Sequence, residues 1–412
     1  FISLSYLNLL VNDAVMNNQL PELLAPAGSL EKLKVAINYG ADAVYLGGLK
    51  FGLRTAAENF TEDQLREGVA YAHERGAKVY VVLNGFLHDE DIAELKDYLL
   101  FLDEIKIDAT IVSDIGVINQ VRTHTNIPVH LSTQASCLNV ESARFWKKQG
   151  CERVVLGREV SIQEAQKIKK EADIEVEMFI HGSMCMAYSG NCVISNFTQG
   201  RDSNRGGCAH SCRFEYSIAK PDETEKKRAF FMSSKDLNGL RYLEEFIKAG
   251  IDSIKVEGRM KSNLYAATIS KVYSQALKYY QEHGHFLSEK IYEWDEELKK
   301  VNHRTYEQAN LMQPAGSETI FNERETDSSV QYKVAGNVIE SMGDHVFIRV
   351  QNAFNIGDQL EFLTFKGASI EYTVNEVMDI QNNTLERTKP STIVKLPLTD
   401  HVDKEAIVRL RC

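Results

Sequence analysis

The sequence predicts an α/β protein made of a TIM-like (β/α) barrel with a cysteine-rich insertion, followed by a small all-β domain. From Glu22 onward, short apolar runs alternate with amphipathic stretches whose apolar residues recur every three or four positions. After Val330 this pattern gives way to period-two alternation with Gly and Asn turns. Strands that alternate with helices over about 250 residues indicate a parallel barrel, and period-two strands indicate a separate β domain.

Nine apolar runs are candidate barrel strands. Three of the stretches between them, over residues 29–40, 61–76 and 161–173, open with Ser or Thr followed by Glu or Asp, which is typical of capped helices. A regular barrel has eight strands, so either one run is not a barrel strand or the closure is irregular. The nine runs are ELLAPAG, ADAVYLGG, KVYVVLNG, ATIVSD, PVHLSTQ, ERVVLG, EVEMFIHG, AFFMSS and DSIKVEG.

The domain organisation follows from these patterns. We predict an N-terminal extension over residues 1–21, a barrel over 22–283 with a Cys-rich insertion at 181–230, a partly helical connector over 284–330, and a small β-barrel or sandwich over 331–412. Residues 262–283 are expected to form one long helix. Met16, followed by NNQLPELLAP, resembles a natural start, which would make residues 1–15 upstream sequence.

Composition limits the kinds of partner that the protein can have. Its 412 residues carry a formal charge of −11, which opposes indiscriminate binding of polyanions, so nucleic acid would need a local basic patch. No run of 18 apolar residues exists, and the opening segment lacks a secretory pattern, so we expect no membrane span and a cytoplasmic protein. In that reducing compartment, cysteines are expected to be thiols or metal ligands.

Four cysteines lie within 28 positions, although the chain has only seven. Six, fifteen and three residues separate them in turn, and only the last pair has the spacing of a structural zinc site. A [4Fe-4S] cluster tolerates irregular spacing when a folded loop supplies the four thiolates, and the surrounding glycines let backbone N–H groups approach the sulfurs. Unrelated buried thiols are the plainer alternative. The four are Cys185, Cys192, Cys208 and Cys212.

Polar residues follow many of the predicted strands. In a parallel barrel these carboxyl ends form one mouth, where catalytic residues collect, although each residue taken singly could be a helix cap. The mouth residues are Asn84, Ser132, Gln134, Arg158, Glu159, His181, Lys235, Asp236, Glu257 and Arg259.

A catalytic thiol is a second chemical reading of the cysteines. His181 precedes Cys185 by one helical turn and could act as its base if this segment were helical. The sequence has no GxSxG or HExxH motif, which lowers the expectation of familiar hydrolytic machinery.

A local basic patch accompanies the cysteines. Residues 201–261 contain thirteen Lys or Arg against ten Asp or Glu. These cations could bind a phosphate or a dicarboxylate, or they could be ordinary surface ion pairs. The candidates near the cysteines are Arg201, Arg205, Arg213, Lys255, Arg259 and Lys261.

The segment EMFIHGSMCMAYSGNCVIS, which begins at Glu177, resembles peptidase family U32, the collagenase-like proteases. ELLAPAGSLEKLKVAINYGADAVYLGG, LSTQASCLN, GRDSNRGGCAHSCRF and IKVEGRMKS are similar to further blocks of that family, and the likeness runs from about Glu22 to the end of the chain. The family carries an old protease label, while better understood members hydroxylate RNA or ubiquinone precursors without oxygen. Within it, this sequence resembles the branch that acts on the wobble uridine of tRNA.

The resemblance implies a function and a ligand set. It implies hydroxylation of a tRNA wobble uridine at C5 with prephenate as oxygen donor, and it matches Cys185, Cys192, Cys208 and Cys212 to cluster ligands. A partner subunit of the same family is a further expectation. Two alternatives stay open: a U32 peptidase with an unrecognised site, and a non-enzymatic protein whose C-terminal domain docks RNA or protein.

The resemblance establishes no catalytic base, so the catalytic and donor-binding candidates are assigned from the residues of this sequence itself. The candidate catalytic side chains are Gln134, Glu177, His181 and Glu257. The candidate cations for the donor or a phosphate are Arg201, Arg205, Arg259 and Lys261.

Overall fold

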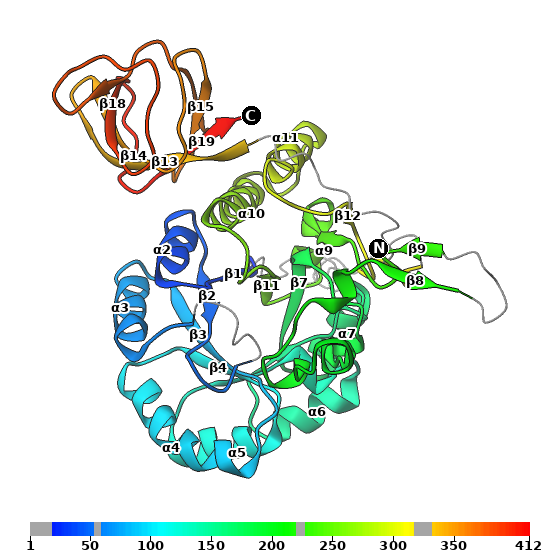
Figure 1. The fold of residues 1–412 in the computed structure, drawn as a ribbon. Helices are drawn as coiled ribbons and strands as arrows, with labels where there is room; N and C mark the ends of the chain where they lie inside the picture. The colour runs from blue at the N-terminus through cyan, green and yellow to red at the C-terminus, as the bar shows by residue number, and fades with distance from the viewer. Residues whose placement is uncertain (1–18, 53–58, 220–226, 317–331) are drawn as a thin grey trace, which may run out of the picture.

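The structure is a computed structural model, and it describes residues 19–52, 59–219, 227–316 and 332–412. The suggested start at Met16, most of the predicted extension and the end of the predicted connector lie outside these residues. Figure 1 shows a closed barrel of strands surrounded by helices, with a separate all-β unit at the C-terminal end of the chain. The predicted fold class is therefore confirmed.

Eight parallel strands close the barrel. Each strand from β1 to β7 pairs with the next, and β11 pairs with both β7 and β1, which completes the ring. The strands are β1 (Glu22–Pro26), β2 (Ala43–Leu46), β3 (Lys78–Leu83), β4 (Ala109–Val112), β5 (Val129–Leu131), β6 (Arg153–Val155), β7 (Glu175–Ser183) and β11 (Ser253–Val256).

Helices cover the outside of this ring (Figure 1). The predicted caps form: the side chains of Ser29, Thr61 and Ser161 accept hydrogen bonds from backbone N–H groups of the first helical turn. Ser262 caps the long helix that was predicted over residues 262–283. The helices are α2 (Leu30–Asn38), α3 (Glu62–His73), α4 (Asp89–Glu104), α5 (Ile115–His124), α6 (Val140–Lys148), α7 (Ile162–Ala172), α9 (Leu243–Lys248) and α10 (Asn263–His283).

The run AFFMSS is the surplus candidate strand, and it is not part of the barrel. Its first residue, Ala229, ends β9 (Lys227–Ala229), which pairs with β8 (Tyr216–Ile218) in a hairpin. The next strand, β10 (Asp236–Asn238), runs antiparallel to the end of β7 and pairs with β12 (Tyr306–Glu307). Because β7 extends beyond the barrel rim, its last residues offer an edge to which β10 pairs. Of the two alternatives for the nine runs, the first is correct: one run is not a barrel strand. The eight-stranded ring itself closes regularly.

The cysteines lie on the segment between β7 and β10. This segment contains short helical turns and one helix, α8 (Ile194–Gln199). The turns are η2 (Tyr188–Gly190), η3 (Ser203–Arg205) and η4 (Ser211–Arg213), and η5 (Leu240–Tyr242) leads into α9. In the predicted connector, α11 (Ser288–Leu298) precedes β12.

The C-terminal unit is one seven-stranded antiparallel sheet with its own apolar core, and its described residues contain no helix. It packs against the barrel through Tyr39, whose hydroxyl donates to the carbonyl of Leu363 (2.7 Å) and accepts from the backbone N–H of Ile407 (2.9 Å). None of the described helices has the length and apolar character needed to cross a membrane. The strands are β13 (Tyr332–Met342), β14 (His345–Val350), β15 (Gln359–Phe362), β16 (Ile370–Thr373), β17 (Met378–Asp379), β18 (Ile393–Pro397) and β19 (Ile407–Arg411).

Candidate active site at the carboxyl ends of the strands

A cavity of about 300 Å³ opens at the carboxyl ends of the barrel strands. The ends of β3, β5, β6 and β11 contribute to its wall, and the Cys-rich segment closes it from the other side. This is the end at which parallel barrels place their catalytic residues. Predicted mouth residues that line it are Asn84, Ser132, Gln134, Arg158, Glu257 and Arg259.

All four clustered cysteines line this same cavity, and each is a free thiol. Local hydrogen bonds fix the loop that carries them. Asn204 accepts from the backbone N–H of Cys192 (3.3 Å) and donates to its carbonyl (3.1 Å). The backbone N–H of Ile194 donates to the Sγ of Cys192 (3.4 Å). Such N–H contacts stabilise negative charge on sulfur.

Electrostatics also indicate that the thiols lie near one another. Burial raises the pKa of Cys212, and the charges of the other three cysteines raise it further, while the Arg213 guanidinium opposes them. Even so, within the described residues no three His, Cys, Asp or Glu side chains are grouped closely enough to hold a single metal ion. A zinc ion needs its sulfur ligands within about 2.3 Å, whereas an iron–sulfur cluster is a larger object. The four free thiols that line the cavity are soft donors, the type that zinc and iron–sulfur clusters take as ligands.

Most of the charged side chains in the cavity wall are cationic. The lining contains six cations and one carboxylate, Glu257, in a protein of net charge −11. Behind the lining, Glu177 pairs with Lys255, and Asp236 pairs with Lys261 and Arg304. Lys261 is largely buried, and this burial lowers its pKa. A cavity with this balance favours an anionic ligand. The six are Arg158, Arg213, Lys255, Arg259, Lys261 and Arg304.

Gln134 and Glu257 are the candidate catalytic residues that reach the cavity. The Oε1 atom of Gln134 accepts from the hydroxyl of Ser132 and from Asn84 (3.3 Å). An Oε2 atom of Glu257 accepts from the hydroxyl of Tyr45 (3.2 Å). The two side chains bring an amide and a carboxylate to the same space.

Glu177 lies deeper, inside the barrel, and is fully buried. Its carboxylate pairs with Lys255 Nζ (2.8 Å) and Arg153 Nη1 (3.4 Å), and Arg153 also pairs with Glu22 (2.7 Å). Burial alone would lower the pKa of Arg153, but the two carboxylates raise it above its usual value. Glu177 therefore balances the positive charges of Lys255 and Arg153 inside the barrel. Of these two partners, Lys255 also lines the cavity.

His181 is absent from the cavity lining and is fully buried elsewhere. Its Nδ1 atom lies 3.2 Å from the Tyr273 hydroxyl, and its ring packs against Tyr265, Tyr273 and Tyr306. Burial lowers the pKa of His181 to about 3. It occupies strand β7, so the helical arrangement that would bring it beside Cys185 does not form.

Two of the predicted cations also lie outside the cavity lining. Arg201 is exposed, and Arg205 donates to Asp91 (2.9 Å) and to the carbonyl of Phe86 (2.8 Å). Conversely, sequence reasoning missed Arg304 and Tyr45, which line the cavity. Arg304 comes from the connector, which has no pattern, and Tyr45 lies in a run that reads as purely apolar.

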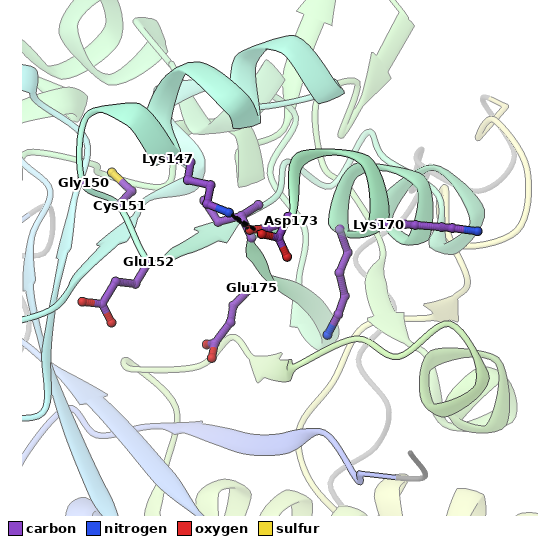
Figure 2. A pocket seen from close by; sticks show the side chains of 9 residues that line it. Lys147, Gly150, Cys151, Glu152, Lys170, Asp173 and Glu175 are labelled. Atoms are coloured by element: carbon purple, nitrogen blue, oxygen red, sulfur yellow. Dashed lines mark hydrogen bonds and ion pairs between the residues drawn. The ribbon is translucent and has the colours of Figure 1, made fainter. Parts of the chain in front are cut away.

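A second hollow of about 700 Å³ lies at the opposite end of the barrel (Figure 2). Its residues lead into β6 and β7, with Glu175 as the first residue of β7, and Figure 2 shows Lys147 directed toward Asp173 across it. It contains Cys151, whose pKa burial raises to about 12, and none of the predicted site residues. This amino end of a parallel barrel serves stability, so the cysteine-lined cavity is the candidate active site.

Fold and site together define a (β/α) barrel protein with a cysteine-lined, cationic cavity. The chain matches the model of peptidase family U32 over residues 28–320 and that of the family's C-terminal domain over residues 330–409. It belongs to peptidase family U32.

The chain is similar to several named proteins. It is 40% identical to tRNA hydroxylation protein P1 of Bacillus subtilis, with 97% of each chain covered. It is 32% identical to tRNA hydroxylation protein P of Escherichia coli, over 87% of this chain and 89% of the relative. It is 34% identical to a collagenase of Porphyromonas gingivalis, over 69% of this chain and 72% of that protein.

Proposed function

We propose that this protein hydroxylates the wobble uridine of tRNA at C5, with a [4Fe-4S] cluster as cofactor and prephenate as oxygen donor, in the cytoplasm. One observation carries the proposal: a single cavity at the catalytic end of the barrel is lined by all four clustered cysteines and by six cationic side chains. Relatives that span nearly the whole chain are named for tRNA hydroxylation, which supplies the RNA class.

Cys185, Cys192, Cys208 and Cys212 would hold the cluster. All four are free, and at least Cys192 receives a backbone N–H, as cluster sulfurs commonly do. When bound, the cluster would supply redox chemistry or assist oxygen transfer. The protein's own part is to position the two substrates and exclude water.

The cations of the cavity suit a donor with two carboxylates. Arg259 and Lys261 come from the loop after β11, and Arg158 comes from the loop after β6, so charge is offered from two sides. In a balanced transfer, the C5–H bond of uridine becomes C5–OH, and the donor exchanges its C–O bond for C–H. The donor thereby gains the two electrons that the uridine loses, and no dioxygen is consumed.

Gln134 and Glu257 would bind the edge of the base. Uracil offers two carbonyl acceptors and one N–H donor, and these match an amide donor and a carboxylate acceptor. Gln134 is held by Ser132 and Asn84 through its oxygen, which orients its NH₂ group.

Nucleoside mass spectrometry of tRNA tests the function. A deletion strain should lose 5-hydroxyuridine derivatives, and a plasmid copy of the gene should restore them. Unchanged levels in the deletion strain would refute the proposal.

Metal analysis tests the cofactor separately. Protein purified without oxygen should contain about four iron and four sulfide per chain, and Cys212→Ala should lose most of both. Cys151→Ala is the matched control, because Cys151 is buried at the other end of the barrel. Stoichiometric zinc without iron would overturn the cluster assignment.

The peptidase alternative is favoured by relatives that are named as a collagenase and as a protease. It predicts gelatin cleavage by purified protein that is lost in Cys185→Ala. Cleavage that persists without all four cysteines would point to a contaminant.

A docking role for the C-terminal sheet predicts instead that tRNA modification survives Cys212→Ala. A partner subunit of the same family would copurify with the tagged protein.

A further inference from the structure

Exposed apolar side chains are concentrated around the cysteines. Six of the nineteen exposed large apolar side chains in the described part of the chain lie within residues 186–218. Such a concentration marks an interaction surface. The six are Met186, Tyr188, Val193, Phe197, Phe214 and Ile218, and Met260 is exposed on the cavity wall itself.

Phe197 is the most exposed of them, at 95% of its surface. It lies on α8, whose residues Ile194 and Ser195 line the cavity. The aromatic ring therefore stands on a helix that forms part of the cavity wall, and its own surface is directed to solvent.

This helix is held rigidly on the cysteine loop. Ser195 accepts from the backbone N–H of Ala209 (3.0 Å), and the hydroxyl of Thr198 lies 2.7 Å from that of Ser211. Asn196 accepts from the backbone N–H of Ser203 (3.0 Å). Because Ser195 and Thr198 bond to residues between Cys208 and Cys212, and Asn196 bonds to Ser203, the backbone that carries Phe197 is fixed on the cysteine loop.

Two more exposed aromatic residues lie next to cavity-lining residues in the chain. Tyr188 is 61% exposed and lies two residues before Gly190, which lines the cavity. Phe214 is 43% exposed and directly follows the lining residues Cys212 and Arg213. Each exposed ring is thus close in the chain to a residue of the cavity wall.

We propose that Phe197, with Tyr188 and Phe214, forms a stacking surface for unpaired bases of the tRNA anticodon loop. Proteins read single-stranded RNA by stacking its bases on aromatic side chains while cations contact the backbone. The cations are present in the cavity wall and in exposed Arg201, two residues beyond α8. RNA is favoured over a protein partner, because a protein bound to these residues would cover the cavity that the uridine base must enter.

This inference rests on the proposed function and names where the RNA loop is held. The test uses full-length protein, a fluorescent anticodon stem-loop RNA and three variants. Phe197→Ala should weaken binding roughly tenfold, as loss of one stacked base does. Phe197→Trp should retain binding because it keeps an aromatic face. Tyr292→Ala, which removes an exposed aromatic ring of α11, is the matched control and should bind like the wild type.

Iron content and oligomeric state are measured for each variant and should stay unchanged. If wild-type protein binds the RNA and Phe197→Ala binds equally well, the stacking surface is refuted while the proposed function stands. If Phe197→Ala weakens binding only by changing the oligomeric state, the surface is a protein interface. If the wild type neither binds nor modifies tRNA, both proposals fall.

Discussion

The guanidinium of Arg213 donates to the carbonyl oxygen of Met184 at 2.7 Å. Met184 directly precedes Cys185, and Arg213 directly follows Cys212. A second donation from Arg213 reaches the carbonyl of Ser234. This one side chain therefore ties together the first and the last of the four cysteines, which are far apart in the loop, and joins both to the strand that follows.

Loss of this tie should weaken cluster retention. Arg213→Lys keeps the charge but cannot reproduce the forked donation to two carbonyl groups. We expect its iron content to fall at least twofold under air, with a smaller change in oxygen-free buffer. The measurement is iron and sulfide per chain over time. Arg201→Lys is the control, because Arg201 is exposed and outside the cavity lining; equal loss in both variants would argue against the tie.

The buried pair of Glu177 and Lys255 should be strongly coupled. Lys255→Met leaves Glu177 with Arg153 as its remaining partner at 3.4 Å, and Glu177→Gln leaves Lys255 charged in the barrel interior. Breaking a buried pair by removing one partner costs about 3–5 kcal/mol. We expect each single variant to lose about 3 kcal/mol of unfolding free energy.

The double variant Glu177→Gln, Lys255→Met should lose clearly less than the sum of the two. Urea denaturation of the four proteins gives the coupling energy. If the losses of unfolding free energy in the two single variants simply add in the double variant, Glu177 and Lys255 do not stabilise each other.

His181 should make stability depend on acid pH. Its pKa is about 3 in the folded protein and 6.5 in the unfolded chain, because burial disfavours the charged ring. Between these values the unfolded state binds more protons, so the unfolding free energy rises with pH from about 3 to 6.5 and is constant above. His181→Phe should flatten this rise in urea denaturation measured at several pH values.

The same variant separates structure from catalysis. At pH 7.5 the imidazole is neutral in both states, so His181→Phe should retain tRNA hydroxylation to within a few-fold if it folds. Complete loss of activity in a folded variant, with the acid dependence unchanged, would instead make His181 a catalytic residue.

Local patterns in the sequence determine the elements of this protein. Apolar runs and the caps at Ser29, Thr61 and Ser161 predict strands and helices because backbone hydrogen bonding and alternation act over a few residues. The density of cysteines also predicts a shared site from local sequence. Four thiols within 28 positions of one loop are near one another in the chain.

Tertiary structure alone decides which polar side chains face the cavity. Glu177 and Phe179 point into the barrel, and simple alternation along β7 would direct His181 there too. An irregularity in the pairing of β7 with β11, between Lys255 and Val256, accompanies the turn of His181 toward Tyr273 on α10. Likewise Arg304 reaches the cavity from the connector, because the residues leading into β12 lie beside Asp236 at the start of β10. Side-chain direction and long-range pairing depend on the whole fold, and no local pattern encodes them.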